Sequence, residues 1–463
     1  LDKACELSRL GGGQPAFYND EEIIPAKVNR GETLEDARNY AIVGCVEPAS
    51  QGKENSWCDA ALFNLPKVLE IAMNNGRLDG KEFGPKTGEF TDFTSFDQFW
   101  NAYVTQMKFC VKLLVRADNA VDIAHGKLGQ LPFASSLVAD CIKTGVNITE
   151  GGAHYNFTGP QGIGAANIGN ALMVLKKLVF QEHKLTMQQL KDAMDHNWGK
   201  AEGTDSTNAD KSADANTTAA TGSNTSYDDI AAAVRKVLNE SGTETSDTNT
   251  ATATATAPAS ANDYQKIHDM VMDVDKFGND KDEVDMLTRK GVRVYCEELE
   301  KYRDPRGGMF NAGLYPVSAN VLFGSYIKAT PDGRYDYETI ADGVSPTRGT
   351  DTLGPTAAAN SVSKLDHFIA SNGTLYNMKF NPSAVAGDAG LQRFAALIRS
   401  FFDRKGGHVQ FNIVNRETLI DAQKHPEQHK DLIIRVAGYS AQFIALDKSV
   451  QDDIIARTEF TKF

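Results

Sequence analysis

The stretch "IIRVAGYSAQF", residues 433–443, most constrains how this chain can fold. It reads as a buried apolar strand that breaks at Gly438, close to the end of the 463-residue chain. A second strand-like run, "YAIVGCVEPAS" (40–50), ends at the lone Cys45, with Glu47 two positions later. Turns are the commonest reason for a glycine at such a break. However, "RVAGYSA" lacks the Asn, Asp and Pro that usually accompany turns, so the sequence favours another role for Gly438.

Radical chemistry offers that role. An α-carbon radical is stabilised when an amide nitrogen donates electron density and a carbonyl withdraws it, which requires both neighbours to be coplanar. A side chain obstructs this planarity, so glycine suits it best. Cys45 alone would read as a small buried hydrophobic residue, and no nearby histidine is present to activate a thiolate. Because residues i and i+2 of an extended strand share a face, we expect Cys45 to take a hydrogen atom and Glu47 a proton from one molecule.

Composition narrows the function classes. The net charge of −13 argues against nucleic acid or an anionic membrane surface as a partner. No apolar run reaches the roughly 18–20 residues of a membrane helix, and no secretory signal opens the sequence. The six cysteines form no CxxC pair, which predicts no zinc or iron–sulfur site in the chain and a reducing cytoplasm.

Apolar spacing predicts helices over 92–128, 186–199, 282–302 and 449–458, and alternation predicts a strand over 406–415. Strands that alternate with helices indicate an α/β class. Residues 202–262 are rich in Ser, Thr, Ala, Asp and Asn, which indicates a flexible surface insertion. One short helix is expected inside it, over 226–242.

The two broken strands resemble the paired motifs of the glycyl radical enzymes, the pyruvate formate-lyase-like family. The blocks "FTGPQGIGAANIGNAL", "NDKDEVDMLTRKG", "ATPDGR" and "ADGVSPTRGTDTLGPTAA" resemble that family too. The resemblance implies the C-terminal part of a ten-stranded α/β barrel, in which the cysteine and glycine loops meet tip to tip. It implies barrel residues at 1–201 and 263–335, and a glycine radical domain at 336–463. Since family members are usually longer on the N-terminal side, we expect the native gene product to be longer.

Within the family, "GCVE" with a single Cys45 resembles the eliminating branch, and the B12-independent glycerol and propanediol dehydratases above all. Choline lyase, hydroxyproline dehydratase and isethionate lyase share the motif. Asp59 falls at the acidic position that assists the departure of water, and Cys58 stands where the family has histidine. "GLYPVSANV" resembles a pocket-lining stretch, which implies that Tyr315 and Val317 form part of the substrate wall.

The resemblance also implies a mechanism and partners. A radical S-adenosylmethionine activase with a 4Fe-4S cluster would remove one hydrogen from Gly438, and Cys45 would become a thiyl radical. Glu47 would take the hydroxyl proton of a small polar substrate, and Asp59 would assist the leaving hydroxide. The product would be an aldehyde, with no permanently bound cofactor or metal. A homodimer in the cytoplasm of an anaerobe, or within a bacterial microcompartment, is expected.

Two alternatives stay open. One is a C–N or C–S lyase that acts on choline or a hydroxyalkyl sulfonate. The other is a catalytically incomplete fragment that needs an N-terminal half. "GPQGIGAANIG" is rejected as a dinucleotide-binding fingerprint, because it lacks the third glycine at the required spacing and follows no clear strand. The acidic cluster in "NDKDEVD" is expected to be a solvated face or a helix cap.

Overall fold

The computed structural model describes residues 1–200 and 260–463. Most of the expected insertion, including its short helix at 226–242, lies outside these residues. Helix α11 (Ala261–Met272) begins inside the range expected for the insertion. Its start is set by a capping box, in which Ser260 and Asp263 each bond the other's backbone N–H. Residues 261 and 262, which the composition assigned to the insertion, are therefore helical.

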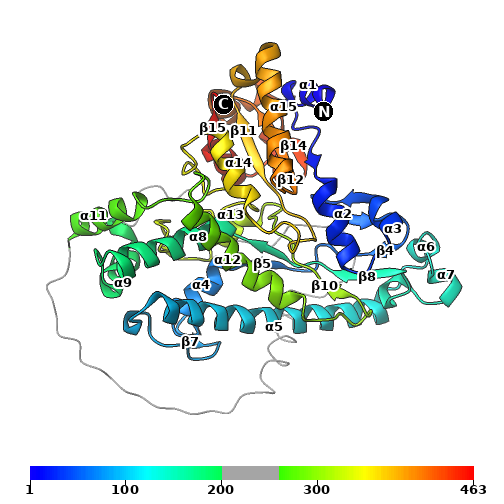
Figure 1. The fold of residues 1–463 in the computed structure, drawn as a ribbon, viewed down its shortest axis with the longest axis horizontal. Helices are drawn as coiled ribbons and strands as arrows, with labels where there is room; N and C mark the ends of the chain where they lie inside the picture. Colours follow the sequence, from blue (N-terminus) through cyan, green and yellow to red (C-terminus); the bar gives the residue numbers. More distant parts are fainter. Residues whose placement is uncertain (201–259) are drawn as a thin grey trace.

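The long helices follow the apolar spacing of the sequence. The four predicted helices are confirmed as α5 (Phe96–Leu128), α9 (Met187–Asp195), α12 (Asp282–Leu299) and α17 (Lys448–Ala456). A capping box between Thr186 and Gln189 starts α9. Helix α5 runs along much of the longest dimension of the molecule (Figure 1). No helix among the described residues combines the length and apolar character needed to cross a membrane.

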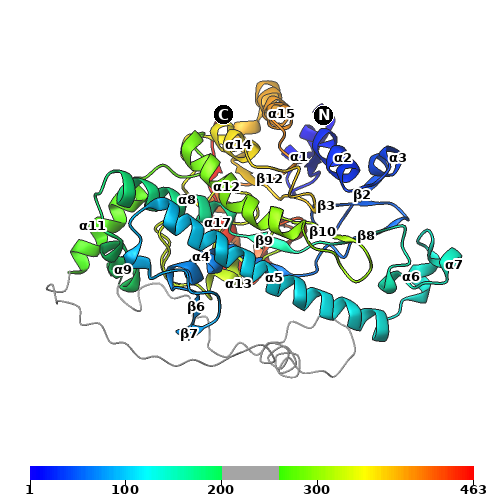
Figure 2. The same ribbon diagram turned by 60° about the horizontal axis from the view of Figure 1, so that its bottom comes forward.

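Other α-helices connect these elements. They are α1 (Asp2–Arg9), α2 (Asp20–Asn29), α3 (Leu34–Arg38), α4 (Leu65–Met73), α6 (Pro132–Ser136), α7 (Cys141–Thr144), α8 (Ala165–Val174), α13 (Ala319–Gly324), α14 (Pro355–Ser363), α15 (Gly387–Asp403) and α16 (Arg416–Lys424). Every residue of α8 is buried, so this helix is the centre of the helical layer. It packs on α4 and α12, and α5 packs on the same two helices (Figure 2).

Short strands, most of them paired in parallel, form small sheets, which are called the parallel wall below. One sheet has the order β1 (Phe17–Tyr18), β12 (His408–Ile413), β11 (Asn377–Phe380) and β15 (Glu459–Phe460). A second has the order β10 (Met309–Phe310), β8 (Tyr155–Thr158) and β4 (Glu54–Asn55), and β5 (Leu62–Asn64) pairs with β9 (Gln161–Ile163). Apart from the antiparallel β1, all these strands pair in parallel. The predicted strand at 406–415 is confirmed as β12.

Three antiparallel hairpins complete the strands: β2 (Tyr40–Val43) with β3 (Glu47–Ser50), β6 (Arg77–Leu78) with β7 (Lys81–Glu82), and β13 (Ile433–Arg435) with β14 (Ser440–Gln442). The last of these has its own apolar core, which α16 and α17 share through Leu419, Ile434, Phe443 and Ile454. Both chain termini lie on the side of the molecule that carries α15 (Figures 1 and 2).

Candidate active site

Cys45 lies at the tip of a hairpin. Strands β2 and β3 pair up to Val43 and Glu47, so Gly44, Cys45 and Val46 form the turn. Gly44 adopts a φ of +65°, which a residue with a side chain rarely takes. The expectation that Cys45 and Glu47 share one face of an extended strand is wrong, because the chain reverses direction between them. They are neighbours because the hairpin brings them together.

The Glu47 carboxylate folds back over this turn. Its Oε2 accepts hydrogen bonds from the backbone N–H of Cys45, at 2.6 Å, and from the N–H of Val46. Lys27 supports the hairpin from below by donating a hydrogen bond to the Pro48 carbonyl at 3.0 Å. The carboxylate that was expected to act as a base therefore also holds the shape of the cysteine loop.

Gly438 lies at the tip of the other hairpin. Arg435 pairs with Ser440, and the N–H of Val436 donates to the carbonyl of Tyr439 at 2.8 Å. Gly438 has a φ of +83°. The turn role that the sequence disfavoured is therefore real, although no Asn, Asp or Pro marks it. The turn does not exclude radical chemistry, because both uses require a residue without a side chain.

The two hairpin tips meet. A Cβ atom placed on Gly438 would lie 2.1 Å from Cys45 Cβ and 2.5 Å from Cys45 Sγ. These separations are far below van der Waals contact, so no side chain fits at position 438. One α-hydrogen of Gly438 occupies that direction and points at Cys45. This is the arrangement that a hydrogen-atom transfer between the two residues requires.

Burial determines the protonation states at the tips. Cys45 is 8% exposed, and burial, helped by the nearby Glu47 charge, raises the pKa of its thiol to about 12. The S–H bond is therefore intact at neutral pH, as hydrogen-atom transfer needs, and a thiolate nucleophile is disfavoured. Glu47 is 2% exposed, and burial raises the pKa of its carboxyl to about 7. This residue can hold or release a proton near neutral pH.

Tyr315 and Val317 pack in the apolar cluster that contains Cys45. They belong to one apolar cluster with Val46 and Ala437. The Tyr315 hydroxyl donates to the Cys58 carbonyl at 2.8 Å and accepts from Asn372 Nδ2 at 2.9 Å. Because its single proton is used in that bond, Tyr315 presents its ring rather than a donor to the site.

Asp59 lies next to this cluster on an exposed loop position. Partial desolvation raises the pKa of its carboxyl, and its charge in turn raises the pKa values of Cys45 and Glu47. Burial, followed by the Glu47 charge, raises the pKa of the neighbouring Cys58 thiol to about 12. The structure thus brings all six sequence-predicted site residues into one region, with Asp59 at its edge.

Gln161 was missed by the sequence reasoning. It comes from the rejected stretch "GPQGIGAANIG". The expectation that this stretch follows no clear strand is wrong, because β8 (Tyr155–Thr158) ends directly before it and β9 (Gln161–Ile163) lies within it. Gln161 is fully buried beside the Tyr315 hydroxyl. Neither of its amide atoms makes a hydrogen bond of good geometry to the described residues. A lone glutamine within an apolar, glycine-rich run was the one signal that could have found it.

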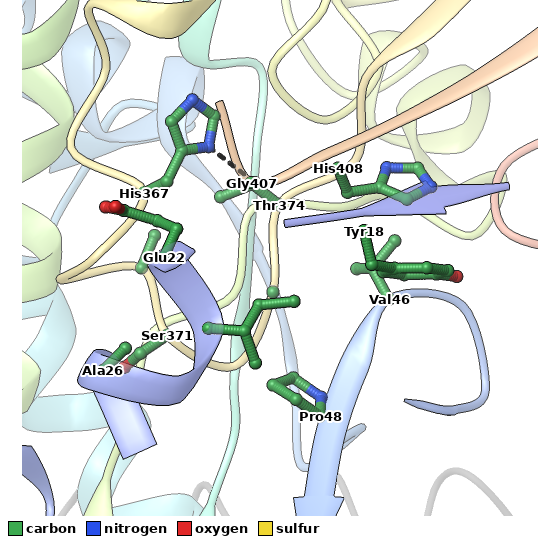
Figure 3. Close-up of a pocket in the computed structure, with 13 residues that line it drawn as sticks. Tyr18, Glu22, Ala26, Val46, Pro48, His367, Ser371, Thr374, Gly407 and His408 are labelled. Carbon is green, nitrogen blue, oxygen red and sulfur yellow. Dashed lines mark hydrogen bonds between the residues drawn. The ribbon is translucent and has the colours of Figure 1, made fainter. Parts of the chain in front are cut away.

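A small pocket lies behind the cysteine hairpin (Figure 3). The Tyr18 hydroxyl donates to the Cys45 carbonyl at 3.0 Å, and the Tyr18 ring lies 4.9 Å from the ring of His408. Burial lowers the pKa of His408 to about 3 and that of His367 to about 4. Both histidines are therefore neutral at physiological pH and supply no charge to the hairpin.

The acidic cluster Asp280, Asp282 and Asp285 has the spacing of a cation site. However, Lys364 Nζ lies 2.6, 2.7 and 2.8 Å from these three carboxylates. The ammonium group pairs with all three carboxylates. Asp280 and Asp282 are exposed, whereas Asp285 is fully buried. The cluster is an ion-pair network between α12 and the residue after α14.

Comparison with known families agrees with this geometry. Residues 1–324 match the pyruvate formate lyase-like family, and residues 340–444 match the glycine radical family. The chain therefore belongs to the pyruvate formate lyase-like glycyl radical enzymes. This confirms the fold and the family that the resemblance implied. A glycine radical domain implies a glycyl radical that is formed after translation.

The relatives are dehydratases and lyases. The chain is 35% identical to (2S)-3-sulfopropanediol dehydratase of Klebsiella oxytoca, over 99% of this chain and 49% of that protein. It is 48% identical to the glycerol-bound B12-independent glycerol dehydratase of Clostridium butyricum, over 99% of this chain and 50% of that one, with a TM-score of 0.84. A Roseburia inulinivorans structure described for 1,2-propanediol dehydration matches at 49% identity and a TM-score of 0.85, over 99% and 51% of the two chains. The chain thus spans about half the length of these relatives.

Proposed function

We propose that the complete protein is a glycyl radical hydro-lyase that converts glycerol or another 1,2-diol to an aldehyde and water. The observation that carries this proposal is the approach of the Gly438 tip to the buried Cys45 thiol, beside the Glu47 carboxyl. The identities of 48% and 49% to the two diol-related structures favour this substrate class.

In the proposed reaction, the Gly438 radical removes the hydrogen of the Cys45 thiol. The thiyl radical then takes a hydrogen atom from a hydroxyl-bearing carbon of the substrate. Glu47 accepts the proton of that hydroxyl group, which leaves a ketyl radical. The ketyl expels hydroxide from the neighbouring carbon and becomes a carbonyl-bearing carbon radical. That radical recovers the hydrogen from Cys45, and the thiyl regenerates the Gly438 radical.

Asp59 is proposed to give a proton to the departing hydroxide, so that water leaves. A raised pKa suits this role, because it keeps more of the carboxyl protonated at a given pH. The proton on Glu47 returns to Asp59 through solvent, so the net reaction removes only water from the diol. Glu47 and Asp59 then act as the base and the acid of one elimination.

The proposed substrate wall consists of Tyr315, Val317 and Gln161. The Tyr315 ring and Val317 supply apolar contact beside Cys45. Gln161 supplies the polar contact, because its buried amide has no good hydrogen bond of its own and can pair with a substrate hydroxyl. Such a pairing satisfies a buried amide that otherwise costs free energy.

Radical formation requires an outside source. We propose a radical S-adenosylmethionine activase with a 4Fe-4S cluster as the partner that removes one hydrogen from Gly438. The protein's contribution is a residue without a side chain of its own, on a hairpin with its own small apolar core.

The test is an anaerobic assay of the complete gene product after incubation with such an activase. Glycerol, 1,2-propanediol, choline, trans-4-hydroxyproline and isethionate are offered separately, and aldehyde, trimethylamine and sulfite are measured. We expect a Gly438 radical by electron paramagnetic resonance (EPR) and aldehyde from a diol. Sulfite or trimethylamine as the main product would refute the diol assignment, and absence of a radical would refute the enzyme class.

A further inference from the structure

Strand β12 carries a row of buried polar side chains toward the glycine hairpin. Along His408–Ile413 the residues alternate between polar and apolar. Val409, Phe411 and Ile413 belong to the main apolar core. Gln410 and Asn412 are also buried, at 0% and 4% exposure. They point to the opposite face of the sheet from these apolar residues. Buried amides need partners, and here the partners are on the hairpin that bears Gly438.

Asn412 binds the backbone of the hairpin at one residue. Its Nδ2 donates to the Arg435 carbonyl at 2.7 Å, and its Oδ1 accepts from the Arg435 N–H at 2.9 Å. Arg435 stands opposite Ser440 in the hairpin, and the next residue, Val436, donates its N–H across the hairpin to Tyr439. Because hydrogen-bonded and non-hydrogen-bonded pairs alternate in an antiparallel hairpin, the N–H and C=O of Arg435 point away from β14. The amide of Asn412 therefore replaces a neighbouring strand on the open edge of β13.

Further contacts fix the same segment. Gln410 Oε1 accepts from Arg435 Nε at 3.1 Å, and Gln410 Nε2 donates to Asn377 Oδ1. Asn377 Nδ2 donates to the Val436 carbonyl at 3.3 Å. These side chains come from β11 and β12, which belong to the rigid parallel wall. The last residues before the glycine tip are thus held against the parallel strands through backbone atoms of Arg435 and Val436 and through the Arg435 side chain.

The short distance between Gly438 and Cys45 makes these fixing contacts important. An atom on Gly438 in the direction of the thiol would already lie within 2.5 Å of Cys45 Sγ. A shift of the hairpin along its axis changes the hydrogen-transfer distance directly. In positioned reactions, a misplacement of about 1 Å costs about 10²-fold in rate.

We propose that Asn412 is a positioning residue that sets how far the Gly438 tip advances onto Cys45. It thereby controls the rate of hydrogen-atom exchange between these two residues. The proposal rests on the proposed function, since it assumes a radical on Gly438. It concerns a step that precedes substrate, so it can be measured without one.

The experiment follows deuterium uptake at Gly438 in the activated, complete protein. The remaining α-hydrogen of the radical splits its EPR signal into a doublet. In deuterium oxide the Cys45 thiol becomes S–D. Each return of the radical through this thiol then places deuterium on Gly438, and the doublet collapses to a singlet. The rate is expressed per radical, so the yield of activation does not affect it, and Cys45→Ala gives the background.

We expect Asn412→Ala to slow the collapse at least tenfold. Asn412→Asp keeps the size and the acceptor for the Arg435 N–H but loses the donor to its carbonyl, so it should fall between Asn412→Ala and the wild type. This second variant carries the test if the first does not fold. The matched control is Asn279→Ala. Asn279 is also buried and also bridges backbone groups, donating to the carbonyls of Lys276 and Thr350, but it does not touch the hairpin.

Collapse rates in the Asn412 variants within twofold of the wild type would overturn the proposal while leaving the proposed function intact. An equal slowing in Asn279→Ala would also overturn it, because the effect would then come from general destabilisation. A wild-type protein that forms no radical would refute the proposed function itself, and the positioning role with it.

Discussion

Replacing Glu47 by glutamine tests two properties of this carboxylate: the free-energy cost of burying its charge, and its role as a proton acceptor. Glu47 is 2% exposed, and burial raises its pKa from an ordinary value of 4.5 to about 7. The folded protein therefore binds this proton more tightly than the unfolded chain does. The stabilisation from this tighter proton binding at Glu47 is complete below pH 4.5, falls as the pH rises from 4.5 to 7, and is lost above pH 7. A shift of this size corresponds to roughly 3 kcal/mol.

Glutamine keeps the shape and one acceptor oxygen for the Cys45 and Val46 amides, but it does not titrate. The difference in unfolding free energy between Glu47→Gln and the wild type should therefore change by roughly 3 kcal/mol in favour of the variant between pH 4.5 and pH 8. Turnover per radical should fall to background, since an amide accepts no proton at these pH values. In the wild type, kcat/KM should rise with pH through an apparent pKa near 7.

The assay is denaturant unfolding at several pH values, paired with turnover normalised to the EPR radical content. Asp118→Asn is the matched control, because burial also raises the pKa of Asp118 to about 7 but this residue lies on α5, away from the site. It should show the same direction of pH-dependent stability and keep its turnover. A stability difference for Glu47→Gln that does not vary with pH would refute the burial argument. A variant that still dehydrates would place the base elsewhere.

Four other outcomes are expected. Cys45→Ala should keep the Gly438 radical in EPR spectra and lose turnover; aldehyde formation by this variant would exclude the thiyl step. Exposure of the activated protein to air should cleave the chain near Gly438, visible as two fragments on a denaturing gel, whereas an intact band would place the radical elsewhere. Gly438→Ala should carry no radical and should also unfold at lower denaturant, because its methyl group would lie 2.1 Å from Cys45 Cβ at a φ of +83°. Lys27→Met should destabilise the protein by about 3–5 kcal/mol, since it removes the buried ammonium group that lies 2.8 Å from both Glu32 and Glu54; a loss below about 1 kcal/mol in denaturant unfolding would contradict this.

The helices could be predicted because their signal is local. Apolar spacing and the Ser95 and Thr186 caps determine α5 and α9 over a few turns of chain. The hairpins were harder, because their turns depend on which strands pair. Cys45 was expected on an extended strand and lies in a turn, and Gly438 was expected outside a turn and lies in one. Strands β8 and β9, which precede α8, were overlooked because strands of three or four residues carry too little periodicity.

The site shows the same division. Cys45, Glu47 and Gly438 could be selected from residue type and motif, and Asp59, Tyr315 and Val317 from the resemblance. Gln161 offered only one signal, a lone glutamine within an apolar, glycine-rich run. Asn412 offered none, because an amide in a strand has no distinctive sequence pattern. The tertiary structure singles out Gln161 because its buried amide makes no good hydrogen bond to the described residues, and Asn412 because it bonds to Arg435.

By itself, the sequence determined the kind of chemistry that this chain can support. A glycine, which has no side chain, suits a radical at an α-carbon, and a cysteine near a glutamate supplies a thiol beside a carboxylate. The tertiary structure alone decided that the glycine tip faces that thiol, and that burial keeps the thiol protonated and brings the pKa of the carboxyl to about 7. The reason is physical. Residue type is a local property, whereas distance and desolvation depend on segments from opposite ends of the chain packing against each other.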